Sequence, residues 1–461
     1  MKPMLSNVPS SIHGIAWPAL PVPETSWFLA VLFQLEESQW WPAEKIAEYQ
    51  FRQLNQVAAH ALETVPFYQA RLRAAGIRKG KKAGPEQWQR IPPLKRFELQ
   101  QNEKNLLSRR LPKEHGKLTT LRSSGSTGKP VQVAATQLTN FFWQVFTLRE
   151  HFWRRRDFSG TLAAIRHFAG GGAQHPGLTA TDWGPWTAAI TRTGPSHMLN
   201  SNTDIGLQAA WLLDKNPDYF LSYPSNLKEL ADYFIKSGLK LPRLREIRTM
   251  GEVVDENVRA ICQQAWDVPL ADIYTAQEIG YIALQCPQHA ENYHVQSENL
   301  LVEVLNDHNQ ACRPGEIGKV AVTTLHNYAM PLIRYEVGDY AEVGTPCPCG
   351  RGLPVLSRVL GRQRNMLVLP DGRRIWPTFG VSTWAQDLPI IQFQFVQKDL
   401  ERIEARLVTS RPLTNDEEAR LISALHRRLT YPFQVDFTYM TEIPRSSSGK
   451  FEDFMSDVAR R

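Results

Sequence analysis

The spacing of apolar side chains predicts a long helix near the beginning of the chain. From Pro42 onward apolar residues recur at intervals of three and four, and Pro66 ends the pattern. Residues 1–35 contain several prolines and show no such period, so we expect irregular chain lying over the surface. We assign the helix a packing role. Its apolar stripe consists of Ile46, Leu54, Val57, Ala58, Ala61, Leu62 and Val65.

Strands and helices alternate through the middle of the chain. Ser225 could cap one of these helices and Gly238 could end it, while Cys262 falls on the apolar, core-facing side of the next. The pattern predicts strands at 131–136, 161–165, 219–222, 246–250 and 270–273, and helices at 140–151, 225–236 and 255–266.

The same alternation locates the expected ligand site. Strand–helix–strand units predict a parallel sheet with right-handed crossovers, and such sheets bind ligands beyond the carboxyl ends of their strands. Gly251-Glu252 and residues 274–278 follow two of the strands, so we expect both segments at one edge. Arg166, His167 and Phe168 precede the glycine-rich residues 169–172, which could line a pocket or form a plain connector.

The pattern becomes β-rich beyond residue 300, and a separate small unit begins after Gly361-Arg362. The small unit contains a helix with a capping box, Thr414 to Glu417. We therefore predict an α/β fold. A large N-terminal domain, 1–362, has mixed and parallel sheets and a β-rich subdomain, and a small α+β C-terminal domain spans 363–461. The strands are predicted at 300–305, 319–324, 333–336 and 340–343, and then at 390–396, 402–408 and 433–440.

Composition narrows the functional classes. The 461 residues carry a net charge of +7 and five cysteines, an odd number that argues against a disulfide framework and for the cytoplasm. No apolar run suits a membrane helix, and the first 25 residues do not resemble a signal peptide. The basic clusters at 78–82 and 154–156 could be solvated faces or attract polyanionic small molecules. They lack interleaved aromatic residues, so we expect no nucleic-acid partner.

Residues 122–130 hold the most distinctive local sequence, Arg-Ser-Ser-Gly-Ser-Thr-Gly-Lys-Pro. Two glycines leave backbone amides free to surround an anion, the hydroxyls add donors, and Lys129 supplies a positive charge for a phosphate. The spacing is not that of the Walker P-loop. A flexible surface turn is the alternative.

Seven ordered motifs over nearly the whole chain resemble the adenylate-forming superfamily, and most closely phenylacetate–CoA ligase and its CapK-like relatives. Besides the 122–130 loop, they include the opening pattern that ends at 65–68, Gly251-Glu252, and Tyr274-Thr-Ala-Gln-Glu278. The others are the segment 331–339, Cys347-Pro-Cys-Gly-Arg351 with Gly361-Arg362, and the terminal loop 444–450.

The resemblance implies ATP-dependent adenylation of a carboxylic acid. Gly251, Glu252 and Tyr274 would frame the adenine of ATP, and Asp272 and Thr275, in the same strand end as Tyr274, would also bind the nucleotide. Asp339 would accept hydrogen bonds from the ribose hydroxyls, and Arg362 would lie near the ribose or the phosphates. Glu278 would help bind Mg²⁺. Lys129 and Lys450 would act in catalysis, with Ser123, Ser124, Gly125, Ser126, Thr127 and Gly128 holding the β- and γ-phosphates.

In this family the small domain is mobile and rotates so that a thiol can attack the acyl-adenylate. We therefore expect coenzyme A as the acceptor. The hinge position, two residues beyond the Gly-Arg pair, is often acidic but is Arg364 here, a departure that bears on this second half-reaction. A carrier-protein thiol or an amine is the alternative acceptor, and a non-catalytic, nucleotide-binding, zinc-stapled interaction protein is an alternative of another class.

The cysteines suggest a structural zinc site. Cys347 and Cys349 form a compact pair, Cys286 lies upstream, and three Cys with one His make a common closed zinc site. CapK-like relatives have their histidine just before the next strand, which favours His294 over His289. The alternative is free or buried thiols.

The aromatic residues do not identify the carboxylic acid that is the substrate. Phe141-Phe-Trp143, Trp183 and Trp186 would suit an aryl acid but could equally be core. A homodimer is a further expectation.

Overall fold

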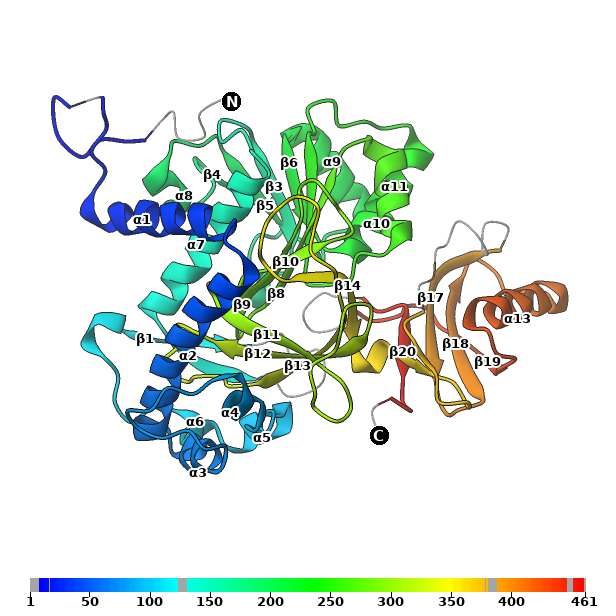
Figure 1. Cartoon of the computed structure of the whole chain (residues 1–461). Coiled ribbons are helices and arrows are strands. Elements are labelled where there is room, and N and C mark those ends of the chain that lie inside the picture. Colours follow the sequence, from blue (N-terminus) through cyan, green and yellow to red (C-terminus); the bar gives the residue numbers. More distant parts are fainter. Residues whose placement is uncertain are drawn as a thin grey trace.

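The computed structural model describes residues 8–15, 17–122, 131–377, 379, 388–445 and 451–459. They form a large body, blue to yellow in Figure 1, and a smaller orange and red body. Among the described helices, none has both the length and the apolar composition needed to cross a membrane.

A mixed sheet runs through the large body. Its order is β11-β12-β13-β14-β10-β9-β8-β7-β6-β3-β5-β4. The strands are β3 (Leu162–Arg166), β4 (Leu178–Ala180), β5 (Ser196–Asn200), β6 (Tyr219–Ser222), β7 (Glu246–Met250), β8 (Leu270–Ala276), β9 (Gly280–Gln285), β10 (Tyr293–Val295), β11 (Leu300–Leu305), β12 (Ile317–Thr324), β13 (Tyr335–Val343) and β14 (Val355–Arg362).

The half of this sheet from β5 to β8 is parallel, as the strand–helix alternation predicts. Helices α9 (Ile205–Lys215), α10 (Pro224–Ser237) and α11 (Glu256–Trp266) pack on it and share a core with the strands. Cys262 lies in this core and is 1% exposed, so the prediction that it is a packing residue is confirmed.

The prediction that Ser225 caps the N-terminus of α10 is wrong. Tyr223 is the N-cap and makes no side-chain cap, whereas Ser225 lies inside the first turn and donates its backbone N–H to Glu252. A carboxylate from another segment therefore satisfies an amide that a capping side chain would otherwise bind. Gly238 does end the helix, with a left-handed φ of 65°.

The other half of the sheet, β9 to β14, is antiparallel. The sequence did not predict β9, because all six of its residues are buried and no apolar–polar alternation is left to detect. Helices cover this half and share its core. They are α2 (Ala43–Thr64), α3 (Pro66–Ala74), α4 (Pro85–Gln89), α5 (Arg96–Gln101) and α6 (Glu103–Leu106).

The predicted stripe of α2 is buried over its whole length, from Ile46 to Val65. A hairpin of β1 (Leu118–Arg122) and β2 (Gln132–Thr136) brackets residues 123–130, which lie outside the described residues. The large body also contains α7 (Gln137–Trp153), α8 (Pro185–Ile190), η1 (Lys113–His115) and η2 (Ala169–Gly171).

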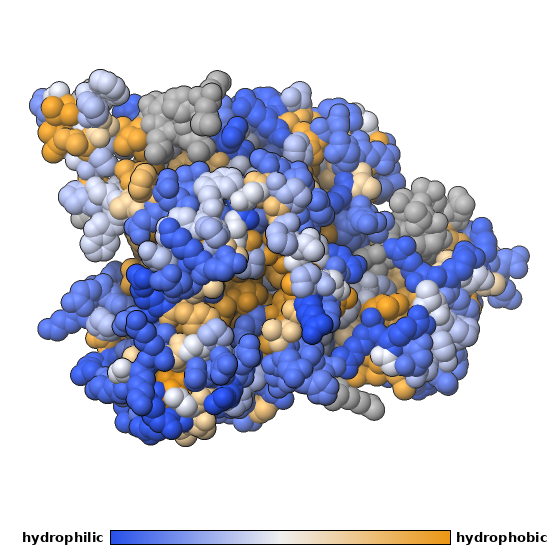
Figure 2. Space-filling view, viewed as in Figure 1, coloured by the Kyte–Doolittle hydropathy of each residue, from blue (hydrophilic) through white to orange (hydrophobic). Residues whose placement is uncertain are grey.

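We expected irregular chain over residues 1–35, and this is wrong from Pro23 onward, because α1 spans Pro23–Ser38. Thr25, Phe28, Leu32 and Leu35 form a buried helical stripe on α1, and its three apolar residues share a core with α7. Exposed apolar residues on the other faces hide this period in the sequence. The segment before α1 projects from the body and carries exposed hydrophobic residues at the upper left of Figure 2.

The smaller body contains a sheet of order β19-β18-β17-β20 with its own core. Thr414 and Glu417 form the predicted capping box. The hairpin β15 (Leu367–Val368) and β16 (Arg374–Ile375) and the turn η3 (Gln363–Asn365) join it to β14. We call this body the small domain; its exact boundary near residue 363 stays a prediction. Its elements are β17 (Ile390–Gln397), β18 (Arg402–Thr409), α13 (Asn415–Leu429), β19 (Gln434–Tyr439) and β20 (Phe454–Ser456).

Candidate active site

A cleft of about 2110 Å³ lies between the carboxyl edge of the parallel strands and the small domain. It is lined on one side by the C-terminal ends of β7, β8 and β14 and by the start of α10. Residues 451–454 of the small domain line it on the other side. The expectation that Gly251-Glu252 and residues 274–278 share an edge is confirmed. Every described residue of the expected nucleotide site lines the cleft, namely Gly251, Glu252, Asp272, Tyr274, Thr275, Glu278, Asp339 and Arg362.

Tyr274 and Asp339 form a hydrogen-bonded pair in the cleft, and Arg362 lies beside them as an ion-pair partner of Asp339. The Tyr274 hydroxyl donates to Asp339 Oδ2 at 2.9 Å, and Arg362 Nε lies 3.6 Å from Asp339 Oδ1. The β13–β14 register places Asp339 directly opposite Arg362. Burial raises the pKa of Tyr274 well above its usual value, and the Asp339 charge raises it further, so Tyr274 remains a hydrogen-bond donor.

Arg362 keeps its positive charge in this enclosed position. Burial alone would lower the pKa of the guanidinium, but the carboxylates of Asp339 and Glu278 more than compensate and raise it. The cleft therefore holds a permanent cation beside two carboxylates, which suits a ligand that carries both anionic groups and hydroxyls.

Glu278 lies in the tight turn between β8 and β9 and is 4% exposed. Its carboxylate is 3.8 Å from Arg96 at the start of α5. Sequence reasoning missed Arg96, which lies far from any motif. Its position follows from the packing of the N-terminal helices on the antiparallel half.

Both carboxylate oxygens of Asp272 already accept hydrogen bonds from other side chains of the protein. Thr249 donates to Oδ1 at 2.6 Å and Tyr293 donates to Oδ2 at 2.8 Å. Burial raises the pKa of this carboxyl, and the two hydroxyl donors oppose the rise. Asp272 thus links β7, β8 and β10 at the wall of the cleft.

Glu252 also has protein partners. It accepts from the backbone and the hydroxyl of Ser225, at 2.8 and 3.1 Å, and from the backbone N–H of Phe451 at 3.2 Å. Its predicted contact with adenine stays a prediction, as do the ligand roles of the other site residues.

Both predicted catalytic loops have described neighbours that line the cleft. Arg122, the first residue of the 122–130 loop, and Phe451, which directly follows the 444–450 loop, both do so. Arg166, His167 and Phe168 line it too, which supports the pocket interpretation of that segment. The residues Ser123, Ser124, Gly125, Ser126, Thr127, Gly128, Lys129 and Lys450 themselves lie outside the described residues.

A second, smaller cavity of about 20 Å³ lies beside the cleft and shares Trp143 and Glu278 with it. Phe142, Ile279, Gly280 and His326 form much of its wall. The ring of His326 stacks on Phe142 at 3.7 Å, and burial lowers the pKa of His326 to about 4, so the imidazole is neutral. Trp183 and Trp186 pack elsewhere, against Tyr219 and Phe28.

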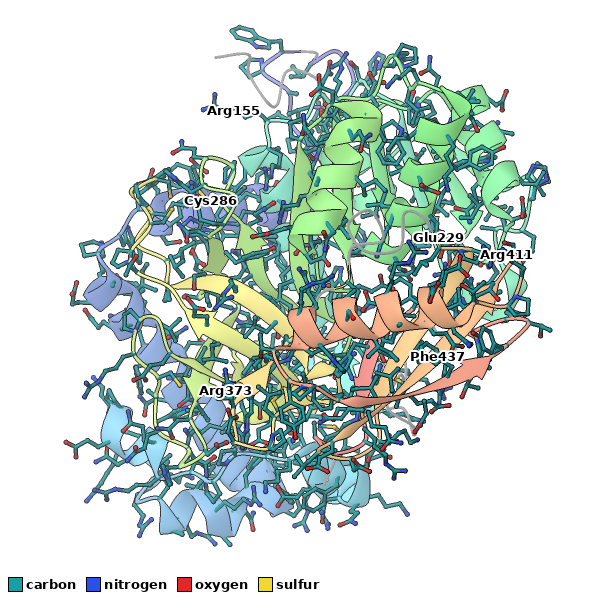
Figure 3. The ribbon with its side chains drawn as sticks, turned by 90° about the vertical axis from the view of Figure 1, so that its right-hand side faces the viewer. Arg155, Glu229, Cys286, Arg373, Arg411 and Phe437 are labelled. Atoms are coloured by element: carbon teal, nitrogen blue, oxygen red, sulfur yellow. The ribbon has the colours of Figure 1, made fainter. Side chains whose placement is uncertain are left out.

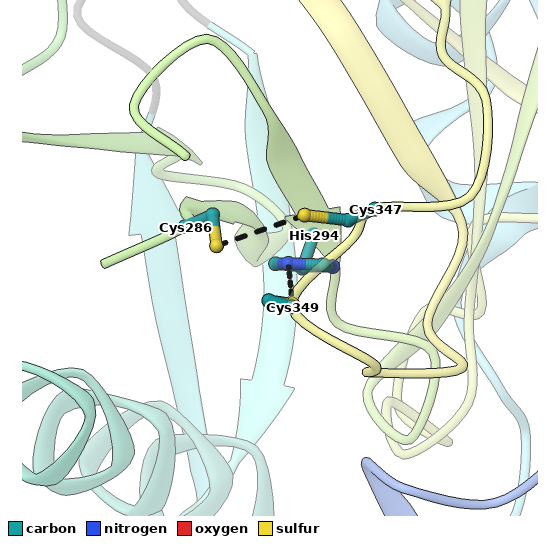
Figure 4. A group of neighbouring side chains, drawn as sticks. All are labelled: Cys286, His294, Cys347 and Cys349. Atoms are coloured by element: carbon teal, nitrogen blue, oxygen red, sulfur yellow. Dashed lines mark hydrogen bonds between the residues drawn. The ribbon is translucent and has the colours of Figure 1, made fainter. Parts of the chain in front are cut away.

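The predicted metal residues come together away from the cleft. The ligand atoms of Cys286, His294, Cys347 and Cys349 all lie within 4.8 Å of one another (Figure 4). Cys349 Sγ is 3.3 Å from His294 Nε2, and Cys347 Sγ is 3.8 Å from Cys286 Sγ. Burial lowers the pKa of His294 to about 4, which leaves the imidazole neutral. His289 is instead paired with Glu291.

At the predicted hinge position, Arg364 is buried and bonded to Glu452. Its Nε donates to Glu452 Oε1 at 3.0 Å. Neighbouring side chains bind the same body, since Gln363 donates to the Ala459 carbonyl and Asn365 to that of Phe454, each at 2.8 Å. Residues 363–365 are thus attached to the small domain.

Three comparisons with known proteins bear on this site. The CapK C-terminal domain family model matches residues 367–457. Phenylacetate-coenzyme A ligase of Thermus thermophilus is 28% identical over 73% of this chain and 74% of its own length. Protein CapK of Staphylococcus aureus is 24% identical over 51% of each. A solved structure of 2-hydroxyisobutyryl-CoA ligase in the postadenylation state has a TM-score of 0.71 and 18% identity, covering 92% of both chains.

The bonding of Asp272 predicts a role in stability. Replacement of Asp272 by Ala would leave the buried hydroxyls of Thr249 and Tyr293 without their acceptor, so we expect a loss of about 2–3 kcal/mol in the free energy of unfolding. Chemical denaturation measures this loss. A variant of unchanged stability that binds nucleotide poorly would instead favour the predicted contact with ATP.

Proposed function

We propose that this chain is an adenylate-forming enzyme of the phenylacetate–CoA ligase and CapK type, which activates a carboxylic acid with ATP and transfers the acyl group to coenzyme A. The observation that carries this proposal is the convergence of Tyr274, Glu278, Asp339 and Arg362 on one cleft that the small domain also lines.

In the first half-reaction, a carboxylate oxygen of the acid attacks the α-phosphorus of ATP, and pyrophosphate leaves as the acyl-adenylate forms. Two anions must approach each other, so the site has to concentrate positive charge. Arg362 supplies one such charge, and Lys129 and Lys450 supply the others in this proposal. Asp339, oriented by the Tyr274 hydroxyl, accepts hydrogen bonds from the ribose.

Magnesium fits the same cleft. Glu278 offers a buried carboxylate whose described partner, Arg96, lies at 3.8 Å, beyond hydrogen-bonding distance. Mg²⁺ bound there would neutralise phosphate charge.

In the second half-reaction, the thiol sulfur of coenzyme A attacks the acyl carbon, the bond from that carbon to the phosphate oxygen breaks, and AMP leaves. The proton of the thiol passes to solvent. The relatives named as CoA ligases support coenzyme A as acceptor. A carrier-protein thiol or an amine is the alternative.

The relatives named phenylacetate-coenzyme A ligase support an aryl acid as substrate. The smaller cavity, at about 20 Å³, has room for about one water molecule and not for the ring. Its described walls are aromatic, aliphatic or neutral polar, apart from Glu278 where it meets the cleft. Gly280 keeps it open, since a Cβ there would lie 3.5 Å from Trp143, and the φ of +104° would strain any other residue. Trp143 also lines the large cleft, where its ring could pack against a planar aryl group of the substrate.

The decisive experiment is acid-dependent exchange of pyrophosphate into ATP, followed by thioester formation with coenzyme A. We expect exchange with aryl acids and a CoA thioester as product, and loss of exchange in Lys450→Ala with ATP binding kept. Exchange without a thioester would move the acceptor to carrier proteins or amines. ATP binding without exchange for any acid would contradict the enzyme proposal and favour the non-catalytic alternative.

The Tyr274–Asp339 pair gives a second prediction. In Asp339→Asn an amide replaces one acceptor oxygen beside Arg362, so we expect the KM for ATP to rise about tenfold, with a smaller rise in Tyr274→Phe. Steady-state kinetics at varied ATP measure both. The matched control is Asp371→Asn, an exposed carboxylate in the β15–β16 turn. Equal KM values in Asp339→Asn and this control would remove Asp339 from the ATP site.

We also propose that Cys286, His294, Cys347 and Cys349 bind a structural zinc ion. The support is their donor set, three thiols and one neutral imidazole within 4.8 Å, which suits a closed tetrahedral site. Zinc there would join the end of β9, β10 and the turn before β14.

Metal analysis tests this proposal. We expect about one zinc per chain, which His294→Ala should lose together with several degrees of melting temperature, because metal binding contributes directly to folding stability. His289→Ala, which changes the neighbouring histidine, should retain both. Purified wild-type protein without metal, or equal loss in the two variants, would contradict the assignment.

A further inference from the structure

The small domain rests on the first turns of α10. Arg445, just after the last predicted strand, forms an ion pair with Glu229 of α10 and donates to the Ser225 hydroxyl at 3.3 Å. Lys228, between these two residues, donates to the Phe379 carbonyl at 2.9 Å. Figure 3 shows Glu229 on α10, where the green large body faces the orange small domain. The contacts therefore come from three partly buried side chains in the first turns of one helix.

Glu252 extends this contact to the other side of the predicted catalytic loop. One carboxylate oxygen accepts from the Ser225 amide, and the second accepts from the Ser225 hydroxyl and from the Phe451 amide at 3.2 Å. The chain of bonds Arg445–Ser225–Glu252–Phe451 thus joins two residues that precede and follow positions 446–450 in the sequence. Both flanks of that segment are held by the same surface of the large domain.

The chemistry of Glu252 suits this task. The first amides of a helix have no partner within the helix, and the helix dipole favours negative charge there. Glu252 satisfies the amide of Ser225, and this fixes its carboxylate so that one oxygen faces the small domain. A fixed carboxylate accepts a charge-assisted hydrogen bond from the Phe451 amide with little loss of side-chain freedom.

We propose that Ser225, Glu229 and Glu252 form a docking seat that holds the small domain in the position required for adenylation, and that Glu252 is a positioning residue for that step. The inference rests on the proposed function, because it assigns the described arrangement to the first half-reaction. In this arrangement residues 451–454 line the same cleft as Asp339 and Arg362. Transfer to coenzyme A requires the small domain to leave the seat.

The two half-reactions measured separately test the seat. We expect Arg445→Ala to slow pyrophosphate exchange about tenfold. The ion pair itself contributes modestly, because its side chains are 23% and 38% accessible, but its loss also frees one flank of the loop. Thioester formation from chemically supplied acyl-adenylate should change less than about twofold, because that step does not use these contacts. Glu252→Gln should show the same split.

A double-mutant cycle and a matched control make the test specific. The double variant Glu229→Ala with Arg445→Ala should be no slower than Arg445→Ala alone, as for partners in one interaction. The control is Arg373→Ala, which removes an ion pair with Asp371 in the small domain and lies well away from Glu229 in Figure 3. It should leave both half-reactions unchanged. Equal slowing of both steps by Arg445→Ala, or strictly additive effects, would overturn the proposal.

Hydrogen exchange examines the seat without any reaction. We expect the peptides that contain Ser225 and Phe451 to exchange faster in Arg445→Ala than in wild type or Arg373→Ala. This readout separates the two proposals. Absence of exchange activity in wild type with faster amide exchange in Arg445→Ala would contradict the enzyme and retain the seat. Active wild-type enzyme with unchanged amide exchange would retain the enzyme and contradict the seat.

Discussion

The antiparallel pairing of β8 with β9 determines where the site can form. β8 is the last strand of the parallel half, and the turn after it reverses the chain at Gly280, whose φ of +104° only glycine adopts easily. Parallel and antiparallel halves therefore meet in one continuous sheet. The open carboxyl edge of the first half comes to lie beside β13 and β14 of the second, and side chains from distant parts of the sequence face one cleft.

The junction of the two halves explains how the polar side chains of the cleft are arranged. Tyr274 belongs to the parallel half, whereas Asp339 and Arg362 belong to the antiparallel half, and the hydrogen bond between Tyr274 and Asp339 crosses the boundary. At the wall of the cleft, Asp272 links strands of both halves through Thr249 and Tyr293. Both carboxylates line the cleft, but the two oxygens of Asp272 accept hydrogen bonds from β7 and β10, so this residue connects the two halves of the sheet.

Periodicity alone predicted β6 and β7 with their observed bounds, because helices with clear apolar faces separate these strands. It failed for α1, whose exposed apolar residues obscure its buried stripe, and for β9, which is buried on both faces. The motifs named the cleft residues that the structure brings together. Pairings such as Glu278 with Arg96 or Glu252 with Phe451 depend on tertiary packing between distant segments, which a single sequence does not encode in any local pattern.

In the proposed rotation of the small domain, the link between β14 and η3 would be the pivot. Arg362 ends β14 with its side chain toward Asp339, while Gln363 is already bonded to the Ala459 carbonyl of the small domain. Within the described residues, the chain passes between the two bodies at this one place. This link lies beside the Asp339 carboxylate, and α13 lies on the side of the small domain away from the large body (Figure 1). A modest rotation about this link would move the outer surface of the small domain over a long distance, whereas the residues beside the link would hardly move.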